Sequence, residues 1–234
     1  MNDKTIIKRI RDWEPDHNDF AFGRTLIIIE DYSKTVQRYG AEDFHYGALL
    51  YSILSLREKF DQHKKQFNEF LCNDYWTAQS ILENRVGVEK ILKRYGFQDR
   101  KIQSVFSSAE EWPKMNITKR MREDKNKGLG EIIRKEIDDR MYGVGYKFAS
   151  LFIRMSGYED IAPIDNWATM YLESRGVTGR HARSGLKPKQ YVVYENKLRE
   201  YAERFNVSVA LFQATIYATW STWKKDSGIL PNYR

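Results

Sequence analysis

The chain has 234 residues, of which 39 are lysine or arginine and 32 are aspartate or glutamate, so its net charge is +7. This basic surplus permits a polyanionic partner but does not by itself establish one. The single cysteine, Cys72, excludes an internal disulfide and a cysteine-held iron–sulfur cluster or zinc knuckle. No run approaches the roughly 20 apolar residues of a membrane span, and the polar N-terminus lacks a signal-peptide core, so we expect a cytoplasmic protein.

Apolar periodicity predicts that the first half of the chain is almost entirely helical. A helix is predicted over residues 19–39, although Leu26–Ile29 can alternatively form a short strand. Residues 43–71 carry a strong helical pattern of leucine and isoleucine, then phenylalanine. Shorter helices are predicted over 74–84, 87–94 and 98–107, and the highly charged residues 108–130 predict a loop that can hold one helical turn.

The second half continues the helical pattern on both sides of a glycine-containing turn. Helices are predicted over about 129–141, 145–156, 165–175, 188–205 and 207–225. Residues 176–187 combine three glycines with several basic side chains and predict a flexible basic loop. No repeat or low-complexity linker divides the chain, so a second domain must share the core of the first or interleave with it.

The turn itself is Gly143-Val144-Gly145, and it lies between two predicted helices. Glycine permits positive φ and close backbone approach, so the two glycines allow a tight hairpin with Val144 inserted into the core. The next helix then presents unpaired N–H groups at its start, which suit a phosphate. An ordinary helix–turn–helix is the alternative, but Ala149 and the apolar residues after it favour a helix-hairpin-helix motif that binds DNA independently of sequence.

The stretch Gly143–Ser150, followed by Ile161-Ala162-Pro163-Ile164-Asp165, resembles the core of the helix-hairpin-helix DNA glycosylases. Within that superfamily it is most similar to the archaeal-type 8-oxoguanine DNA glycosylase/AP lyases. A lysine two residues after the second hairpin glycine marks the bifunctional members, and Lys147 occupies that position. Asp165 follows 18 residues after Lys147, as in the compact archaeal-type enzymes.

The resemblance implies an all-α fold of two helical subdomains with an active cleft between them. We expect residues 43–157 to form a helical barrel that ends in the hairpin. Residues 1–42 and 158–234 are expected to form the second, interleaved subdomain. Lys147 and Asp165 would then lie at the mouth of the cleft.

The chemistry of this family explains the two catalytic residues that the resemblance implies. Cutting an N-glycosidic bond builds positive charge on the sugar, which the carboxylate of Asp165 can stabilise. A neutral amine on Lys147 can attack C1′ and form a Schiff base, from which β-elimination cleaves the strand. The alternatives are a phosphate-contacting or solvated lysine and a plain helix N-cap, and we expect Asp165 to be both cap and catalyst.

Three further residues are candidates for the pocket that holds the extruded base. Trp223 resembles the aromatic residue that stacks on the base in archaeal-type enzymes, and Phe97 is a candidate for the opposite wall. Each ring can alternatively belong to the core. The tail departs from the family, because it is longer and ends in Arg234 instead of the lysine that helps to read oxidised guanine. A different damaged or modified base is therefore an alternative substrate.

Two arginines are candidates for DNA contact in addition to the hairpin residues Gly143, Val144 and Gly145. Arg57 ends the segment Ser52–Arg57, which resembles the family's stretch from which a polar side chain enters the duplex. Relatives usually carry asparagine or glutamine there, and Arg57 can alternatively be a solvated helix residue. Arg183 belongs to a set of basic residues that we expect to face phosphates: Lys119, Arg120, Arg122, Lys125, Lys127, Arg180, Arg183, Lys187 and Lys189. Each of these can alternatively be an ordinary surface residue.

The four histidines show no metal-ligand spacing, so no catalytic metal or other cofactor is predicted. The resemblance also allows a structural alkali ion at the hairpin carbonyls. Three functions compete. They are a bifunctional glycosylase/AP lyase for 8-oxoguanine, a monofunctional glycosylase for another base, and a non-catalytic DNA-binding module. The expected partner is double-stranded DNA containing a damaged base, bound by a monomer that is nucleoid-associated if the source is a prokaryote.

Overall fold

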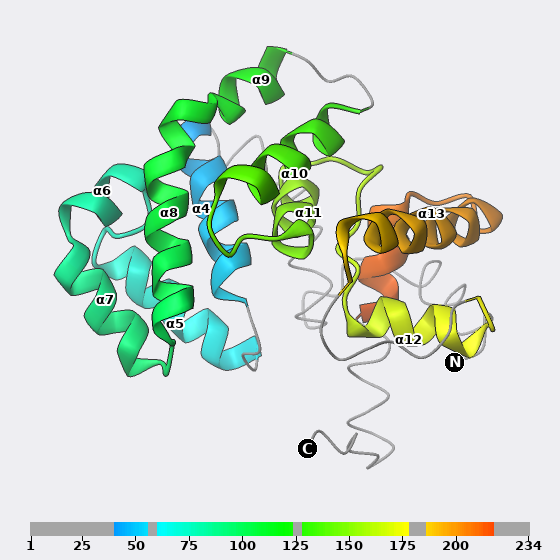
Figure 1. Cartoon of the computed structure of the whole chain (residues 1–234), viewed down its shortest axis with the longest axis horizontal. Helices are drawn as coiled ribbons and strands as arrows, with labels where there is room; N and C mark the ends of the chain where they lie inside the picture. The colour runs from blue at the N-terminus through cyan, green and yellow to red at the C-terminus, as the bar shows by residue number, and fades with distance from the viewer. Residues whose placement is uncertain (1–39, 56–59, 124–127, 178–185, 218–234) are drawn as a thin grey trace. The chain divides into compact units, whose positions relative to one another are not determined.

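The computed structural model describes residues 40–55, 60–123, 128–177 and 186–217, and these residues form helices and their connections without a strand (Figure 1). The predicted all-α class is thereby confirmed. The described residues divide between Gly157 and Tyr158 into two compact units. We refer to described residues up to 157 as the hairpin unit and to those from 158 as the C-terminal unit. The interleaving of residues 1–42 with the second subdomain stays a prediction, as does the cleft.

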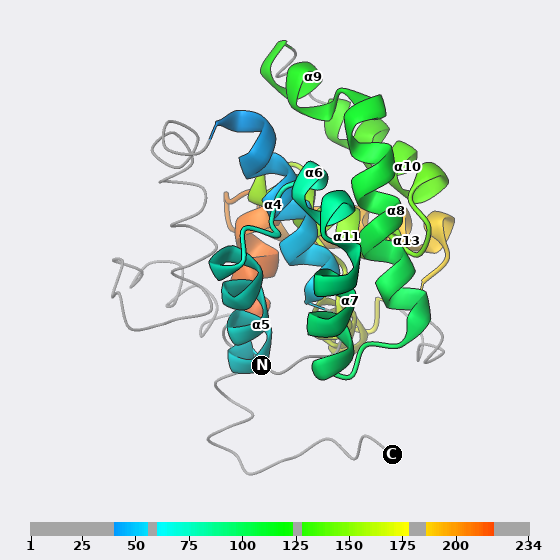
Figure 2. The same cartoon turned by 90° about the vertical axis from the view of Figure 1, so that its left-hand side faces the viewer.

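Eight helices form the described part of the hairpin unit. They are α4 (Ala41–Leu54), α5 (Phe60–Cys72), α6 (Ala78–Glu83), α7 (Arg85–Arg94), α8 (Asp99–Met115), α9 (Ile117–Glu123), α10 (Leu129–Arg140) and α11 (Tyr146–Met155). The central helix is α4, which contacts α5, α8, α9 and α11 (Figure 2). Its side chains are apolar around most of its circumference, as expected for a helix enclosed by others.

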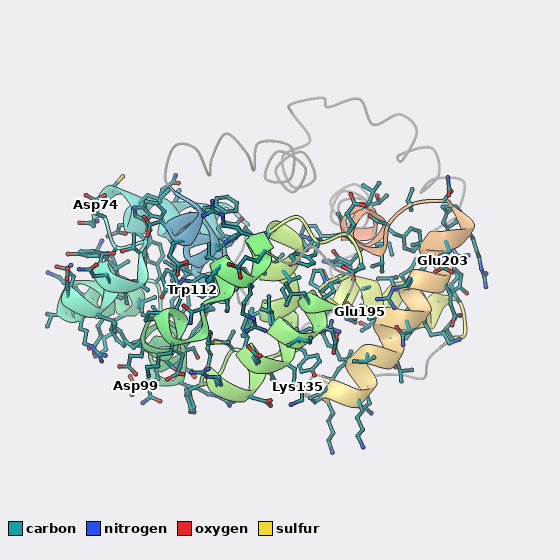
Figure 3. The ribbon with its side chains drawn as sticks, turned by 90° about the horizontal axis from the view of Figure 1, so that it is seen from above. Asp74, Asp99, Trp112, Lys135, Glu195 and Glu203 are labelled. Atoms are coloured by element: carbon teal, nitrogen blue, oxygen red, sulfur yellow. The ribbon has the colours of Figure 1, made fainter. Side chains whose placement is uncertain are left out.

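Aromatic and aliphatic side chains fill the core around α4. Leu49 and Leu50 are fully buried, and Tyr46 packs edge-to-face on Trp112 of α8 at a centroid distance of 5.4 Å. Trp112 in turn packs edge-to-face on Phe152 of α11 at 5.7 Å, and it lies among the helices of this unit (Figure 3). The helix that carries Lys147 is therefore anchored in the same core as α4 and α8.

The helical pattern over residues 43–71 corresponds to two helices, because α4 ends at Leu54 and α5 begins at Phe60. Serines accompany the end of α4. The hydroxyl of Ser52 donates to the carbonyl oxygen of Leu49 at 2.7 Å, and that of Ser55 donates to the carbonyl oxygen of Ser52 at 2.6 Å. Such local bonds compete with continuation of the helix. The candidate helix over 19–39 lies outside the described residues.

The prediction of a loop over residues 108–130 is wrong for most of its length. Helix α8 continues to Met115, Asn116 follows in a left-handed conformation with φ of 50°, and α9 runs from Ile117 to Glu123. Ala109, Trp112 and Met115 are buried at helical spacing. The described charged residues of this segment are exposed or half-buried, and their number masked that apolar stripe in the sequence.

The described part of the C-terminal unit contains α12 (Asn166–Ser174), α13 (Pro188–Arg204) and the helical residues 209–217. Helix α12 contacts α13. Tyr171 joins the three helices, because its ring packs edge-to-face on Tyr201 at 5.6 Å and on Phe212 at 5.5 Å. Phe205 stacks on Phe212 at 5.4 Å, so this unit has an aromatic core of its own.

A buried histidine makes the stability of the hairpin unit depend on pH. The ring of His45 is fully buried, its Nδ1 lies 3.0 Å from the hydroxyl of Thr118, and burial, with a smaller effect of Arg122, lowers its pKa to about 4. In the unfolded chain the ring takes up a proton near pH 6.5. The unfolded state therefore binds more protons between pH 6.5 and about 4, and the free energy of unfolding falls as pH falls through that window.

We predict that His45→Gln, which can keep a hydrogen bond to Thr118, removes part of this pH dependence. Between pH 6.5 and 4.5, the wild-type free energy of unfolding should fall more steeply than that of the variant by about 1 kcal/mol per pH unit. Urea unfolding at several pH values measures both slopes. Parallel curves for the two proteins would contradict a neutral buried His45.

Candidate active site

The hairpin joins α10 to α11 through Met141, Tyr142, Gly143, Val144 and Gly145. The turn is closed by the N–H of Val144, which donates to the carbonyl oxygen of Met141 at 3.1 Å, and Val144 is 1% exposed. The backbone N–H of Tyr142 donates to the hydroxyl of Ser107 in α8 at 2.9 Å. The expected tight hairpin with its valine in the core is therefore present in the structure.

The two glycines serve the hairpin in different ways. Gly143 has φ of +74°, and a Cβ there would lie 2.2 Å from the hydroxyl oxygen of Ser104. Gly145 has an extended backbone with φ of −86°, and its nearest neighbour for a Cβ is an oxygen of Asp138 at 3.6 Å, an ordinary contact. The fold requires a glycine at 143 for conformation and space, whereas it leaves room for a side chain at 145.

A buried arginine, Arg134 of α10, connects the two helices of the hairpin. Its side chain is 1% exposed, donates to the hydroxyl of Ser150 in α11 at 3.1 Å and pairs with Glu131. The guanidinium also lies 5.0 Å from the ring centre of Tyr146. The sequence interpretation did not assign Arg134 a role. Because Arg134 lies three residues before the buried Ile137, helical spacing could have placed it on the buried face of α10.

Lys147 is the second residue of α11, and its side chain is exposed. Gly145 supplies no side-chain cap to this helix, and its carbonyl oxygen accepts the N–H groups of Phe148 and Ala149 at 3.0 and 3.2 Å. Lys147 therefore belongs to the first turn of a helix, whose partially positive start would stabilise an anion.

Asp165 is the N-cap of α12, which confirms the predicted cap. Its Oδ1 accepts the backbone N–H of Ala168 at 2.8 Å, and its Oδ2 accepts the side-chain amide of Gln213 at 3.1 Å. Both carboxylate oxygens are thus held by hydrogen bonds. Gln213, 48 residues further along the chain, was not singled out from the sequence.

The segment before Asp165 is buried but not helical, so its backbone needs hydrogen-bond partners from elsewhere. Two side chains of α13 supply them. The carboxylate of Glu195 accepts the N–H of Ala162 at 2.9 Å, and the hydroxyl of Tyr191 accepts the N–H of Ile164 at 2.7 Å. The hydroxyl of Tyr191 also lies 3.3 Å from the carbonyl oxygen of Ala162, to which it donates. Helix α13 therefore supplies the hydrogen bonds that fix the backbone leading to Asp165.

A family model described as 8-oxoguanine DNA glycosylase matches residues 28–207 of the chain. The chain belongs to this family. Among curated relatives, a protein of Sulfolobus acidocaldarius named an 8-oxoguanine DNA glycosylase/AP lyase is 28% identical over 180 residues, which cover 75% of this chain and 81% of the relative. One of the same name from Aquifex aeolicus is 26% identical over 137 residues, covering 56% of this chain and 58% of that one.

Solved structures of the 8-oxoguanine DNA glycosylase family share this fold. The glycosylase/lyase of Methanocaldococcus jannaschii in complex with DNA containing 8-oxoguanine superposes with a TM-score of 0.70 at 19% identity, covering 96% of this chain and 98% of that one. The 8-oxoguanine DNA glycosylase of Thermotoga maritima gives a TM-score of 0.68 at 18% identity, covering 93% of this chain and 96% of that one.

Of the two catalytic candidates in this family member, Lys147 belongs to the hairpin unit and Asp165 to the C-terminal unit. Their roles stay predictions. Four other candidates, Arg57, Arg183, Trp223 and Arg234, lie outside the described residues.

Phe97 is described, and its ring is 7% exposed, with the amine of Lys101 at 3.7 Å from the ring centre. In this structure it packs as a core residue beneath a lysine. A role for Phe97 in a base pocket stays a prediction.

The basic residues predicted to face phosphates differ in their surroundings. Arg120 is paired with Glu136 of α10, so part of its charge is already compensated within the protein. Lys187 and Lys189 are exposed at the start of α13. Lys119 and Arg122 are exposed on α9, and the others, Lys125, Lys127, Arg180 and Arg183, lie outside the described residues.

Within the described ranges, no three histidine, cysteine, aspartate or glutamate side chains are grouped so as to hold a metal ion. None of the described helices is long and apolar enough to cross a membrane. The absence of a catalytic metal and the alkali ion at the hairpin both stay predictions. At the hairpin, the carbonyl oxygen of Met141 accepts one hydrogen bond and keeps a second lone pair that an ion can use.

We predict that the two hairpin glycines differ in their importance for stability. Gly143→Ala forces an L-residue into positive φ beside Ser104, and it should lower the free energy of unfolding by about 1–3 kcal/mol. Gly145→Ala should change it by less than about 1 kcal/mol. Urea unfolding of both variants measures this difference, and equal losses would contradict it.

Proposed function

We propose that the protein is a bifunctional DNA glycosylase/AP lyase that removes an oxidised purine, 8-oxoguanine foremost, from double-stranded DNA. Lys147 is its nucleophile and Asp165 its catalytic carboxylate. The observation that carries the proposal is that a lysine stands in the first turn after an uncapped glycine hairpin, in a member of this family. The curated relatives are named for both activities, which supports it.

In this proposal the hairpin binds the phosphate backbone of the DNA. Gly145 has neither a positive φ nor a close neighbour, so the fold alone does not explain a glycine there. A phosphate that approaches the start of α11 does explain it, because a side chain at this position would cover the backbone N–H groups. Backbone contacts of this kind fix the position of the protein on DNA without reading its sequence.

Lys147 supplies the covalent step. Its neutral amine attacks C1′, the bond from C1′ to the base breaks, and the base leaves with the bonding electrons and a proton. The C1′–O4′ bond then breaks, O4′ takes up a proton, and the nitrogen, which loses its second proton, forms the C1′=N double bond of the Schiff base. Loss of a proton from C2′ then expels the 3′ phosphate by β-elimination and cleaves the strand. The amine is exposed in the free protein, so bound DNA would have to supply the desolvation that favours its neutral form.

Asp165 stabilises the positive charge that develops on the sugar as the glycosidic bond lengthens. An ionised carboxylate is useful there only if it is aimed, because a charge that must reorient loses much of its effect. The N-cap bond and the bond from Gln213 provide that aim.

Selection of the base is assigned to Trp223, Phe97 and Arg234, in a pocket that receives the extruded nucleotide. A monofunctional glycosylase for another base is the second candidate. Neither the attack by Lys147 nor the charge stabilisation by Asp165 needs a metal. Because the proposed substrate is DNA, we expect the enzyme to be associated with the chromosome.

We predict that sodium borohydride traps the wild-type protein on duplex DNA containing 8-oxoguanine, because borohydride reduces the Schiff base to a stable amine. Lys147→Gln should lower the yield of this adduct by at least about 100-fold, since an amide cannot form it. Gel electrophoresis of the labelled duplex measures the yield.

Lys114→Gln is the matched control, because Lys114 is an exposed lysine of the same unit and the charge change is identical. It should trap like the wild type. An equal yield with Lys147→Gln would contradict the assignment of the nucleophile. Base release whose strand break appears only after alkali treatment would favour the monofunctional alternative.

A further inference from the structure

We propose that Gln213 is the positioning residue for the catalytic carboxylate of Asp165. The inference rests on the proposed function and adds a residue to its machinery. Gln213 fixes the plane of the carboxylate and favours its ionised form. Side chains of α13 hold the backbone that leads to Asp165.

The direct contact is a hydrogen bond in which Nε2 of Gln213 donates to Oδ2 of Asp165 at 3.1 Å. The other oxygen, Oδ1, accepts the N–H of Ala168 at 2.8 Å. Two donors on two different oxygens leave the carboxylate no free rotation about its terminal bond. Each oxygen accepts one of these two hydrogen bonds.

Gln213 is itself held in place by its burial. It is 1% exposed, in a helical segment whose neighbouring residue Phe212 lies in the aromatic core against Tyr171. The N–H of Ala210 also donates to the carbonyl oxygen of Glu159 at 3.2 Å, which attaches this helix to the start of the segment that leads to Asp165. Moving a buried amide side chain away from its hydrogen-bond partner costs free energy, because the buried donor is then left unsatisfied.

The backbone immediately before Asp165 is held by two further side chains, both from α13. Glu195 is 1% exposed and accepts the N–H of Ala162, and Tyr191 accepts the N–H of Ile164 (Figure 3 labels Glu195 on α13). The backbone that leads to Asp165 is therefore held by α13, and the Asp165 side chain is held by Gln213 and the N–H of Ala168. All these contacts lie within the C-terminal unit.

The bond from Gln213 has a chemical consequence that a purely structural contact lacks. A donor to a carboxylate favours the charged form, so removing the donor makes the carboxylate easier to protonate. As the pH is lowered, a variant without this donor then loses activity at a higher pH than the wild type does, because the enzyme needs this carboxylate ionised. A role in packing alone would lower stability without moving the acidic limb of the pH–rate profile.

The test compares single-turnover base release from 8-oxoguanine duplex, as a function of pH, for wild type, Gln213→Met and Gln213→Glu. Methionine keeps the length of the side chain without a donor, and glutamate adds a second negative charge beside Asp165. We expect Gln213→Met to lower the rate at neutral pH about tenfold or more and to shift the acidic limb up by about one pH unit. Gln213→Glu should shift that limb at least as far.

Thr215→Val is the matched control, because Thr215 is buried in the same helix and its hydroxyl donates to the carbonyl oxygen of Leu211 at 2.9 Å. Its acidic limb should stay at the wild-type position. An unmoved limb in both Gln213 variants, with urea unfolding showing that they are folded, overturns the inference.

A second measurement separates this inference from the proposed function. Titration of the Asp165 side-chain carbon by NMR in the free protein reports its protonation without any reaction. Protonation at a higher pH in Gln213→Met than in wild type supports the contact, and an identical titration overturns it. Absence of base release by the wild type overturns the proposed function and the catalytic part of this inference, while the titration still decides whether Gln213 controls the carboxylate.

Discussion

The structure depends on one constraint, which is that polar backbone groups at the start of a helix or in a buried turn need hydrogen-bond partners. The two helices that carry the candidate catalytic residues meet this constraint in opposite ways. Helix α11 begins at Gly145 without a side-chain cap, so the start of that helix stays accessible to a ligand. Helix α12 is capped by Asp165 itself, so the cap and the candidate catalyst are the same carboxylate.

The same constraint explains the residues around them. The buried segment before Asp165 cannot bond to itself, and the side chains of Tyr191 and Glu195 complete it. At the hairpin, Arg134 joins α10 to α11 through Ser150, and Gly143 allows the turn to approach α8. The proposed carboxylate is therefore positioned by how the C-terminal unit satisfies its own backbone, whereas the proposed DNA contact uses a helix start without a side-chain cap.

The sequence predicted what depends on local spacing. The all-α class, the hairpin at residues 143–145 and the cap at Asp165 all follow from residues that are close in the chain, and the structure contains each of them. The end of α8 and helix α9 were missed because charged exposed faces hid a buried stripe that includes Trp112. Gln213 could not be found from spacing, because the fold alone brings it to Asp165 across 48 positions.

In this account, binding of the DNA backbone by the hairpin is separable from catalysis by Lys147 and Asp165. An uncapped helix start would serve any DNA-binding hairpin, and in the proposed function it is Lys147 that adds the lyase chemistry. We propose that the choice of base depends on residues in other parts of the chain, above all Trp223 and Arg234. A member of the 8-oxoguanine DNA glycosylase family can thus keep the chemistry while its substrate differs.

The central claim is that the amine of Lys147 attacks C1′ of the damaged nucleotide. Mass spectrometry of the borohydride-reduced complex with 8-oxoguanine duplex, after protease and nuclease digestion, tests it most directly because it locates the covalent bond. The account predicts a sugar-derived mass increase on the peptide that contains Lys147. A mass increase on another lysine or on the N-terminal amine, with an unmodified Lys147, would contradict it.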